Sequence, residues 1–135
     1  MKRMVQRAVS VVAAITMLSA LGACGGGQSA NGSDEDAINV VASVNQWGTV
    51  AKALGGGNVN VTSIINSTNV EAHDYEPTTA DIAKLQKAQV IVVNGADYDS
   101  WAVKAAKSTK ANVVNAAEVS GKKSGDNPHV WFSAQ

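Results

Sequence analysis

Several residue types are scarce in this sequence, and each scarcity excludes a class of protein. A single cysteine among 135 residues cannot form an internal disulfide, so a disulfide-stapled scaffold is excluded. The 11 basic side chains are balanced by 11 acidic ones, and this neutral balance gives no support to a nucleic-acid partner. A hydrophobic content of 45% is nevertheless typical of a globular chain, and the length suits one small domain.

The sequence also lacks a hydrophobic run that is long enough to cross a membrane comfortably. The apolar run at residues 8–21 is shorter than the roughly 20 residues that a membrane helix needs, and it follows a basic start. This arrangement predicts a secretory signal peptide over residues 1–23. The run ends in LGAC at residues 21–24, which resembles the lipobox of bacterial lipoproteins and makes Cys24 the expected lipidation site. A plain signal peptide with an unrelated cysteine, or an uncleaved anchor, is the alternative.

The segment after the cysteine has the composition of a linker. Residues 24–36 are rich in Gly, Ser, Asn and acidic residues and show no apolar period, which predicts a flexible tether. A lipid-anchored tether would hold a domain of residues 37–135 at the membrane surface, provided that at least two acyl chains supply the anchor.

Strand and helix patterns alternate through the rest of the chain. Apolar and β-branched runs predict strands at 38–44, 59–65, 90–93 and 112–115. Apolar residues at helical spacing predict helices at 45–54, from Thr78 or Thr79 onward, and at about 97–110, with Asn45 as the cap of the first. This order predicts an α/β fold in which helices flank a parallel sheet.

Two loops of this predicted fold carry the only histidines. His73 follows the second predicted strand, and His129 lies beyond the fourth. Ligands of open parallel sheets bind beyond the carboxyl ends of the strands, so both imidazoles can reach the same edge. Imidazole is a common metal ligand, but zinc usually takes four ligands, so two histidines cannot complete a site.

Carboxylates near the histidines could supplement them. Glu71, Asp74, Glu76 and Asp126 could supply oxygen ligands or could hold the second ring nitrogen of a ligating histidine. From the residues alone, the alternative is that each histidine is an exposed loop residue without a function.

Longer motifs around the histidines carry a family resemblance. The sequences AHDYEPTTADI at 72–82 and NPHVWF at 127–132 resemble the histidine motifs of the metal-binding lipoproteins of zinc and manganese ABC importers, the ZnuA-like solute-binding family. Residues 40–65 are similar to the opening strand-helix-strand of that family, and VNG at 93–95 followed by Trp101 resembles a further segment.

The resemblance implies a fold, a function and two ligands. The chain would be the first of two Rossmann-like lobes of a periplasmic-binding-protein fold, and His73 and His129 would be the ligands from that lobe. The protein would not be an enzyme. It would capture Zn²⁺ or Mn²⁺ at the extracytoplasmic face of the cell membrane and deliver it to an ABC permease driven by an ATPase.

The sequence departs from the family pattern in three ways. It ends at Gln135, so we expect the C-terminal lobe, with the third and fourth ligands, to be absent from it. Asn127 stands where the family has an aspartate. The His-rich acidic loop of many zinc-importing relatives is also missing, which weakens zinc relative to manganese without deciding between them.

Two other functions stay open at this point. A metal-dependent hydrolase keeps three protein ligands and an open water position, which two histidines and one loop carboxylate could imitate. A truncated remnant, or a surface adhesin lipoprotein without full metal binding, is the other alternative.

Overall fold

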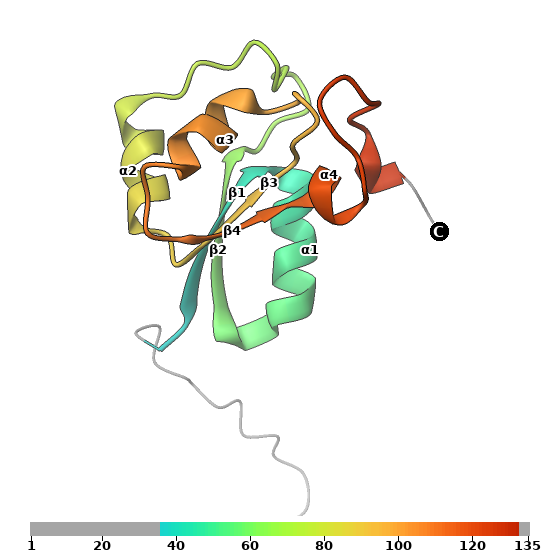
Figure 1. Ribbon diagram of the computed structural model, residues 1–135. Coiled ribbons are helices and arrows are strands. Elements are labelled where there is room, and N and C mark those ends of the chain that lie inside the picture. The colour runs from blue at the N-terminus through green and yellow to red at the C-terminus, as the bar shows by residue number, and fades with distance from the viewer. Residues whose placement is uncertain (1–35, 133–135) are drawn as a thin grey trace, which may run out of the picture. The chain divides into compact units, whose positions relative to one another are not determined.

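The computed structural model describes residues 36–132, which form a four-stranded parallel sheet with helices on both faces (Figure 1). The strands lie in the order β2-β1-β3-β4. Their bounds are β1 Ile38–Val44, β2 Val59–Ile65, β3 Val90–Val93 and β4 Asn112–Asn115. The predicted α/β class and all four predicted strands are therefore confirmed. Residues 1–35, which include the predicted signal peptide, Cys24 and nearly all of the predicted tether, lie outside the described residues.

The helices divide between the two faces of the sheet. Helix α1 covers one face, and helices α2 and α3 cover the other (Figure 1). The helices are α1 Asn45–Gly55, α2 Thr79–Lys87, α3 Ser100–Ala106 and α4 Ala116–Val119, with short 3-10 turns η1 Gly56–Asn58 and η2 Val130–Phe132. None of the helices within residues 36–132 is long and apolar enough to span a bilayer.

The main core lies between the sheet and the α2–α3 layer. Val41, Ile91 and Val93 of the sheet pack against Leu85 and Ala102 of the two helices, and all five are almost fully buried. Burial of each such aliphatic side chain contributes roughly 1.5–3 kcal/mol before entropy is counted. This core fixes β3 at the centre of the sheet, and the turn after β3 carries much of the candidate site.

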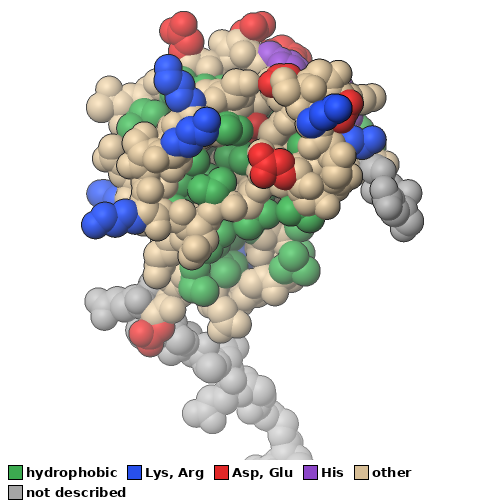
Figure 2. All heavy atoms as spheres, in the orientation of Figure 1, with side chains coloured by type: hydrophobic (Ala, Val, Ile, Leu, Met, Phe, Trp, Pro, Cys, Tyr) green, Lys and Arg blue, Asp and Glu red, His purple; other side chains and the backbone are tan. Residues whose placement is uncertain are grey.

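The α1 face is less completely covered. An apolar groove of about 490 Å³ runs beside α1, and valines of β3 and β4 line part of it. Leu54 of α1 is 85% exposed, although its helical spacing predicted an apolar stripe. Hydrophobic side chains accordingly reach the surface in the lower half of the space-filling view (Figure 2).

Two helix boundaries differ from the prediction. Asn45 does not cap α1, because Val44 already occupies the extended cap position and Asn45 lies inside the helix. Helix α3 covers only Ser100–Ala106 instead of 97–110. Beyond its end, the hydroxyls of Ser108 and Thr109 donate to the carbonyls of the last helical turn, which offers the backbone an alternative to continued helix.

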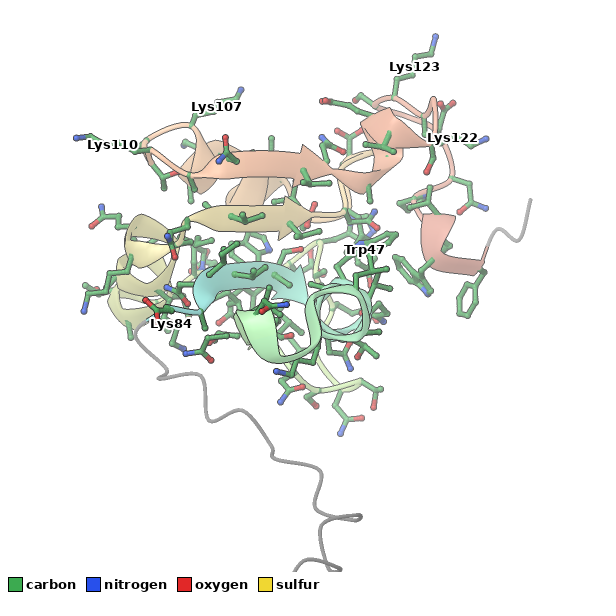
Figure 3. All side chains as sticks on the ribbon, turned by 90° about the horizontal axis from the view of Figure 1, so that it is seen from below. Trp47, Lys84, Lys107, Lys110, Lys122 and Lys123 are labelled. Carbon is green, nitrogen blue, oxygen red and sulfur yellow. The ribbon has the colours of Figure 1, made fainter. Side chains whose placement is uncertain are left out.

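Two lysines of the segment that was predicted as a helix at 97–110 extend away from the sheet. Lys107 and Lys110 follow the end of α3, and both side chains point into solvent (Figure 3).

Candidate metal site

Both histidines lie close to one aromatic ring. The ring centroid of Tyr98 is 5.0 Å from that of His73, in an edge-on arrangement, and 6.0 Å from that of His129. Tyr98 lies in the turn that follows the carboxyl end of β3. The loop with His73 follows β2, and the loop with His129 lies beyond β4. The structure thus brings both imidazoles to one edge of the sheet, as the topology predicted. Their role as metal ligands stays a prediction.

The loop that carries His73 is attached to α3. Trp101 donates its indole N–H to the carbonyl oxygen of Ala72 at 3.2 Å, and Ala72 is 1% exposed. His73 itself is exposed, and its Nδ1 lies 3.2 Å from the carbonyl oxygen of Asp97. A carbonyl oxygen can only accept a hydrogen bond, so Nδ1 carries the proton and Nε2 keeps its lone pair. Figure 2 shows a histidine on the surface at the top of the view, beside acidic side chains.

His129 is oriented in the same way by a different partner. Its Nδ1 lies 2.8 Å from Oδ1 of Asn127, and the backbone N–H of His129 donates to that same oxygen at 3.1 Å. The amide oxygen therefore accepts from Nδ1–H, which again leaves Nε2 free. The ring also packs at 5.2 Å against Trp131 of η2. In both exposed imidazoles, therefore, Nε2 is the nitrogen that remains available to bind a metal ion.

A buried polar pair fixes the turn between β3 and α3. Asn94 and Asp99 are both fully buried. Asn94 donates through Nδ2 to the carbonyl of Pro128 at 2.9 Å and accepts from the indole N–H of Trp47 at 3.0 Å (Trp47 is labelled in Figure 3). The Asp99 carboxylate accepts the backbone N–H groups of Asn94 and Gly95, at 2.7 and 2.9 Å. Asn94 therefore holds the residue that immediately precedes His129.

Asp97 connects the same turn to a second loop. Its carboxylate accepts hydrogen bonds from the Ser124 hydroxyl at 2.5 Å and from the Gly125 N–H at 2.9 Å. These two bonds lower the pKa of Asp97 below its ordinary value, and the electrostatic interaction with His73 acts in the same direction. The loop before His129 is therefore tied to the turn after β3 at two separate points.

The comparisons with known proteins agree with this geometry. A sequence model of the family described as "Zinc-uptake complex component A periplasmic" (ZnuA) matches residues 40–135. The chain belongs to this family. The ZnuA family consists of substrate-binding proteins, which confirms the expectation of a binding protein rather than a hydrolase.

Named relatives of the ZnuA family bind different metals. The chain is 34% identical over 100 residues to the "High-affinity zinc uptake system protein ZnuA" of Bacillus subtilis, covering 73% of this chain and 30% of that protein. It is 29% identical over 131 residues to the "Manganese-binding lipoprotein MntA" of Halalkalibacterium halodurans, covering 90% and 43%. The chain thus spans less than half the length of these relatives.

A solved structure supports the fold. The metal-dependent lipoprotein YcdH from Bacillus subtilis superposes with a TM-score of 0.63 at 34% identity, covering 71% of this chain and 38% of that one. The expected lobe, a parallel sheet flanked by helices, is confirmed by this likeness.

The acidic residues near His73 are not hydrogen-bonded to either ligand candidate in the described part of the chain. Glu71, Asp74 and Glu76 are exposed, and within residues 36–132 no hydrogen bond joins them to a histidine. Glu71 does lie close enough to Tyr98 for its charge to add to burial in raising the tyrosine pKa. Their role around a metal stays a prediction.

The part of this ZnuA-family lobe that the structure describes offers two imidazoles and no third ligand. No group of three or more His, Cys, Asp or Glu side chains within residues 36–132 could hold a metal ion together. A bound ion would therefore keep water or take ligands from elsewhere.

Sequence reasoning missed Asp97, which is hydrogen-bonded to both histidine loops, and Tyr98, which lies close to both imidazole rings. No spacing or motif marks either residue, because their roles depend on loops that are distant in sequence. Asn94 was recognisable as a polar residue at the end of a buried strand, the place where parallel sheets bind ligands.

Proposed function

We propose that this chain captures a divalent transition metal, zinc or manganese, outside the cytoplasm and delivers it to an ABC importer. His73 and His129 are the ligands, and each binds through Nε2. The observation that carries this proposal is their shared orientation: each Nδ1–H is held by a protein oxygen, and both rings lie close to Tyr98. Metal-binding histidines characteristically have their second nitrogen held in this way.

The remaining parts of the proposal concern location and partners. Residues 1–23 act as a lipoprotein signal peptide, Cys24 carries the lipid, and residues 24–36 form the tether. Residues 37–135 form the lobe that receives the metal at the extracytoplasmic face of the cell membrane. A membrane permease with its ATPase takes the metal from the protein. The names of the manganese-binding and zinc-uptake relatives support this assignment.

Donor chemistry does not favour both metals equally. Imidazole nitrogen suits zinc, whereas carboxylate oxygen shifts a site toward manganese. The described residues supply only imidazoles, so this lobe is expected to bind Zn²⁺ more tightly than Mn²⁺.

Metal titrations of histidine variants test the proposal. Wild-type chain, His73→Ala and His129→Ala are titrated with Zn²⁺ in competition with a chromophoric chelator. We expect weak binding by the wild type and a loss of at least about tenfold in each variant, since even residues behind the ligands contribute tenfold or more. Asn69→Ala, an exposed change in the His73 loop, is the matched control and should bind as the wild type does. Unchanged affinity in either histidine variant would contradict the ligand assignment, and submicromolar binding would contradict the count of two ligands.

A further inference from the structure

The turn after β3 has an unusual backbone. Gly95, Ala96 and Asp97 all adopt positive φ angles, of 77°, 47° and 64°. Alanine and aspartate rarely occupy this region, because their Cβ approaches the following carbonyl. Such a conformation persists only where surrounding contacts stabilise it, and it often marks a functional position.

The contacts that stabilise this turn reach both histidine loops. The main-chain carbonyl of Asp97 accepts from Nδ1–H of His73, 24 positions earlier in the chain. The carboxylate of the same residue accepts from Ser124 and Gly125, within the loop that leads to His129. The left-handed backbone turns the carbonyl toward one loop while the side chain faces the other. One residue thus joins the two loops that carry the candidate ligands.

The histidine loops have few other connections to each other. Tyr98 contacts both rings, but a ring contact at 5.0–6.0 Å limits position less strictly than a hydrogen bond. Asn94 fixes Pro128, next to His129, but it does not contact His73. Asp97 is the residue of the described part whose hydrogen bonds reach both loops.

We propose that Asp97 is a positioning residue, which sets the separation of the two imidazoles so that one metal ion can bind both at once. This inference rests on the proposed function. Asp97 acts on His129 through the loop of residues 121–128. Its hydrogen bonds with Ser124 and Gly125, called here the Asp97 tie, hold that loop beside the turn after β3 while the ion binds. Because Asn94 independently holds Pro128, loss of the Asp97 tie should weaken binding without abolishing it.

The test measures Zn²⁺ affinity in variants that weaken the hydrogen bonds of Asp97 with Ser124 and Gly125 from each side. Asp97→Asn keeps a residue that tolerates positive φ and removes the charged acceptor. Ser124→Ala removes a hydrogen bond from the exposed loop and changes no charge. We expect Asp97→Asn to weaken Zn²⁺ binding by up to about tenfold, the low end for residues that orient ligands, and Ser124→Ala to weaken it less. The double variant should lose less than the sum of the two single losses, because both substitutions act on the same set of hydrogen bonds.

Glu118→Gln is the matched control. It also turns a carboxylate into an amide, but it lies in α4, where the Glu118 carboxylate accepts only from Nδ2 of Asn115. It should change the affinity by less than about twofold, which separates positioning from a general loss of negative charge near a cation. Circular dichroism checks that each variant folds, and Ser124→Ala serves as the test if Asp97→Asn does not.

A positioning role also predicts dependence on His129. In a His129→Ala background, where Zn²⁺ binding is followed by the NMR signals of the His73 ring, Asp97→Asn should have no further effect. An equal fold loss in that background, or wild-type affinity of both Asp97→Asn and Ser124→Ala, would overturn this inference. Either result could occur while His73→Ala and His129→Ala still lose metal, so the proposed function would survive. Wild-type affinity in the histidine variants would instead overturn both.

Discussion

Each candidate ligand keeps one ring nitrogen bonded to a protein oxygen. For His129 that oxygen is Oδ1 of Asn127, which lies two residues earlier and also accepts the backbone N–H of His129. The side chain therefore fixes both the ring and the main chain of the ligand. The resemblance to the ZnuA family placed an aspartate here, and the amide found instead retains the same acceptor geometry without the charge.

This contact gives a prediction for Asn127. Asn127→Ala should weaken Zn²⁺ binding by about tenfold, because the His129 ring loses its fixed orientation. Asn127→Asp should bind at least as tightly as the wild type, since a carboxylate accepts from Nδ1–H more strongly than an amide does. Chelator competition measures both affinities. If Asn127→Ala binds like the wild type, the ring does not depend on this contact.

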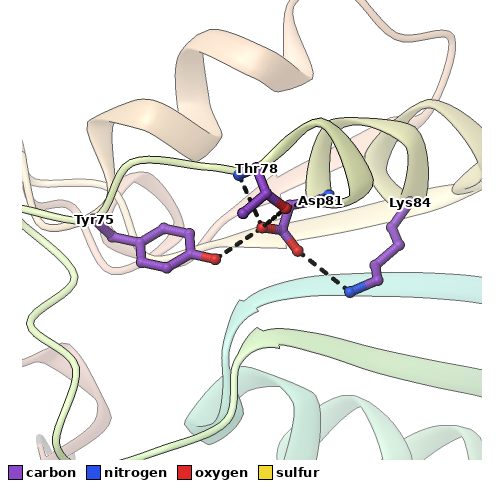
Figure 4. A network of polar contacts seen from close by, with 4 residues as sticks. All are labelled: Tyr75, Thr78, Asp81 and Lys84. Carbon is purple, nitrogen blue, oxygen red and sulfur yellow. Dashed lines mark hydrogen bonds and ion pairs between the residues drawn. The ribbon is translucent and has the colours of Figure 1, made fainter.

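At the scale of elements, the loop that carries His73 ends in a strongly capped helix. Thr78 caps α2, and a reciprocal capping box joins Thr78 and Asp81 (Figure 4). The Asp81 carboxylate also accepts from the Tyr75 hydroxyl at 2.8 Å and from Lys84 at 3.2 Å. Burial alone would raise the pKa of Asp81, but these hydrogen bonds, those from Thr78 foremost, outweigh burial and lower the pKa to about 2.

The lowered pKa predicts acid sensitivity of the fold. The folded pKa of about 2 lies below the ordinary value of 3.8, so the ionised carboxylate stabilises the fold above about pH 4. This stabilisation, about 2 kcal/mol, is lost as the pH falls toward 2. Asp81→Asn should therefore lower the free energy of unfolding by about that amount at pH 7 and by much less near pH 2. Urea denaturation at several pH values measures the difference.

Lys84→Met provides the control for that experiment. The Lys84 side chain is 47% exposed, so its ion pair with Asp81 should contribute less than about 1 kcal/mol. A Lys84→Met variant as unstable as Asp81→Asn would show that the ion pair, and not the capping box, stabilises the start of α2.

The elements show what the sequence could predict and what it could not. The strands and the Thr78 cap follow from local patterns, and the parallel order predicted which edge would receive the histidines. The start of α3 was wrong by three residues, because the positive φ angles at Ala96 and Asp97 arise from contacts with His73, Ser124 and Gly125. Local sequence carries no information about partners 24 and 27 positions away, so Asp97 could not be found before the structure.

At the scale of the whole molecule, the described part is one lobe with a single edge rich in polar contacts. Topology places the ends of β2, β3 and β4 at that edge, and the loops that follow them carry His73, Tyr98 and His129. The ZnuA-family match covers this entire region, and the relatives are more than twice as long. The metal-binding account therefore depends on whether two imidazoles from this lobe act together.

Nuclear magnetic resonance of the histidine ring nitrogens during a Zn²⁺ titration tests that claim most directly. We predict that the Nε2 signals of His73 and His129 shift together, with one midpoint, and stop changing at one equivalent of zinc. In His73→Ala, the His129 signal should no longer shift over the same range of zinc concentration. Two independent midpoints, or a shift of the Nδ1 signals in place of Nε2, would contradict a shared ion held between the two rings.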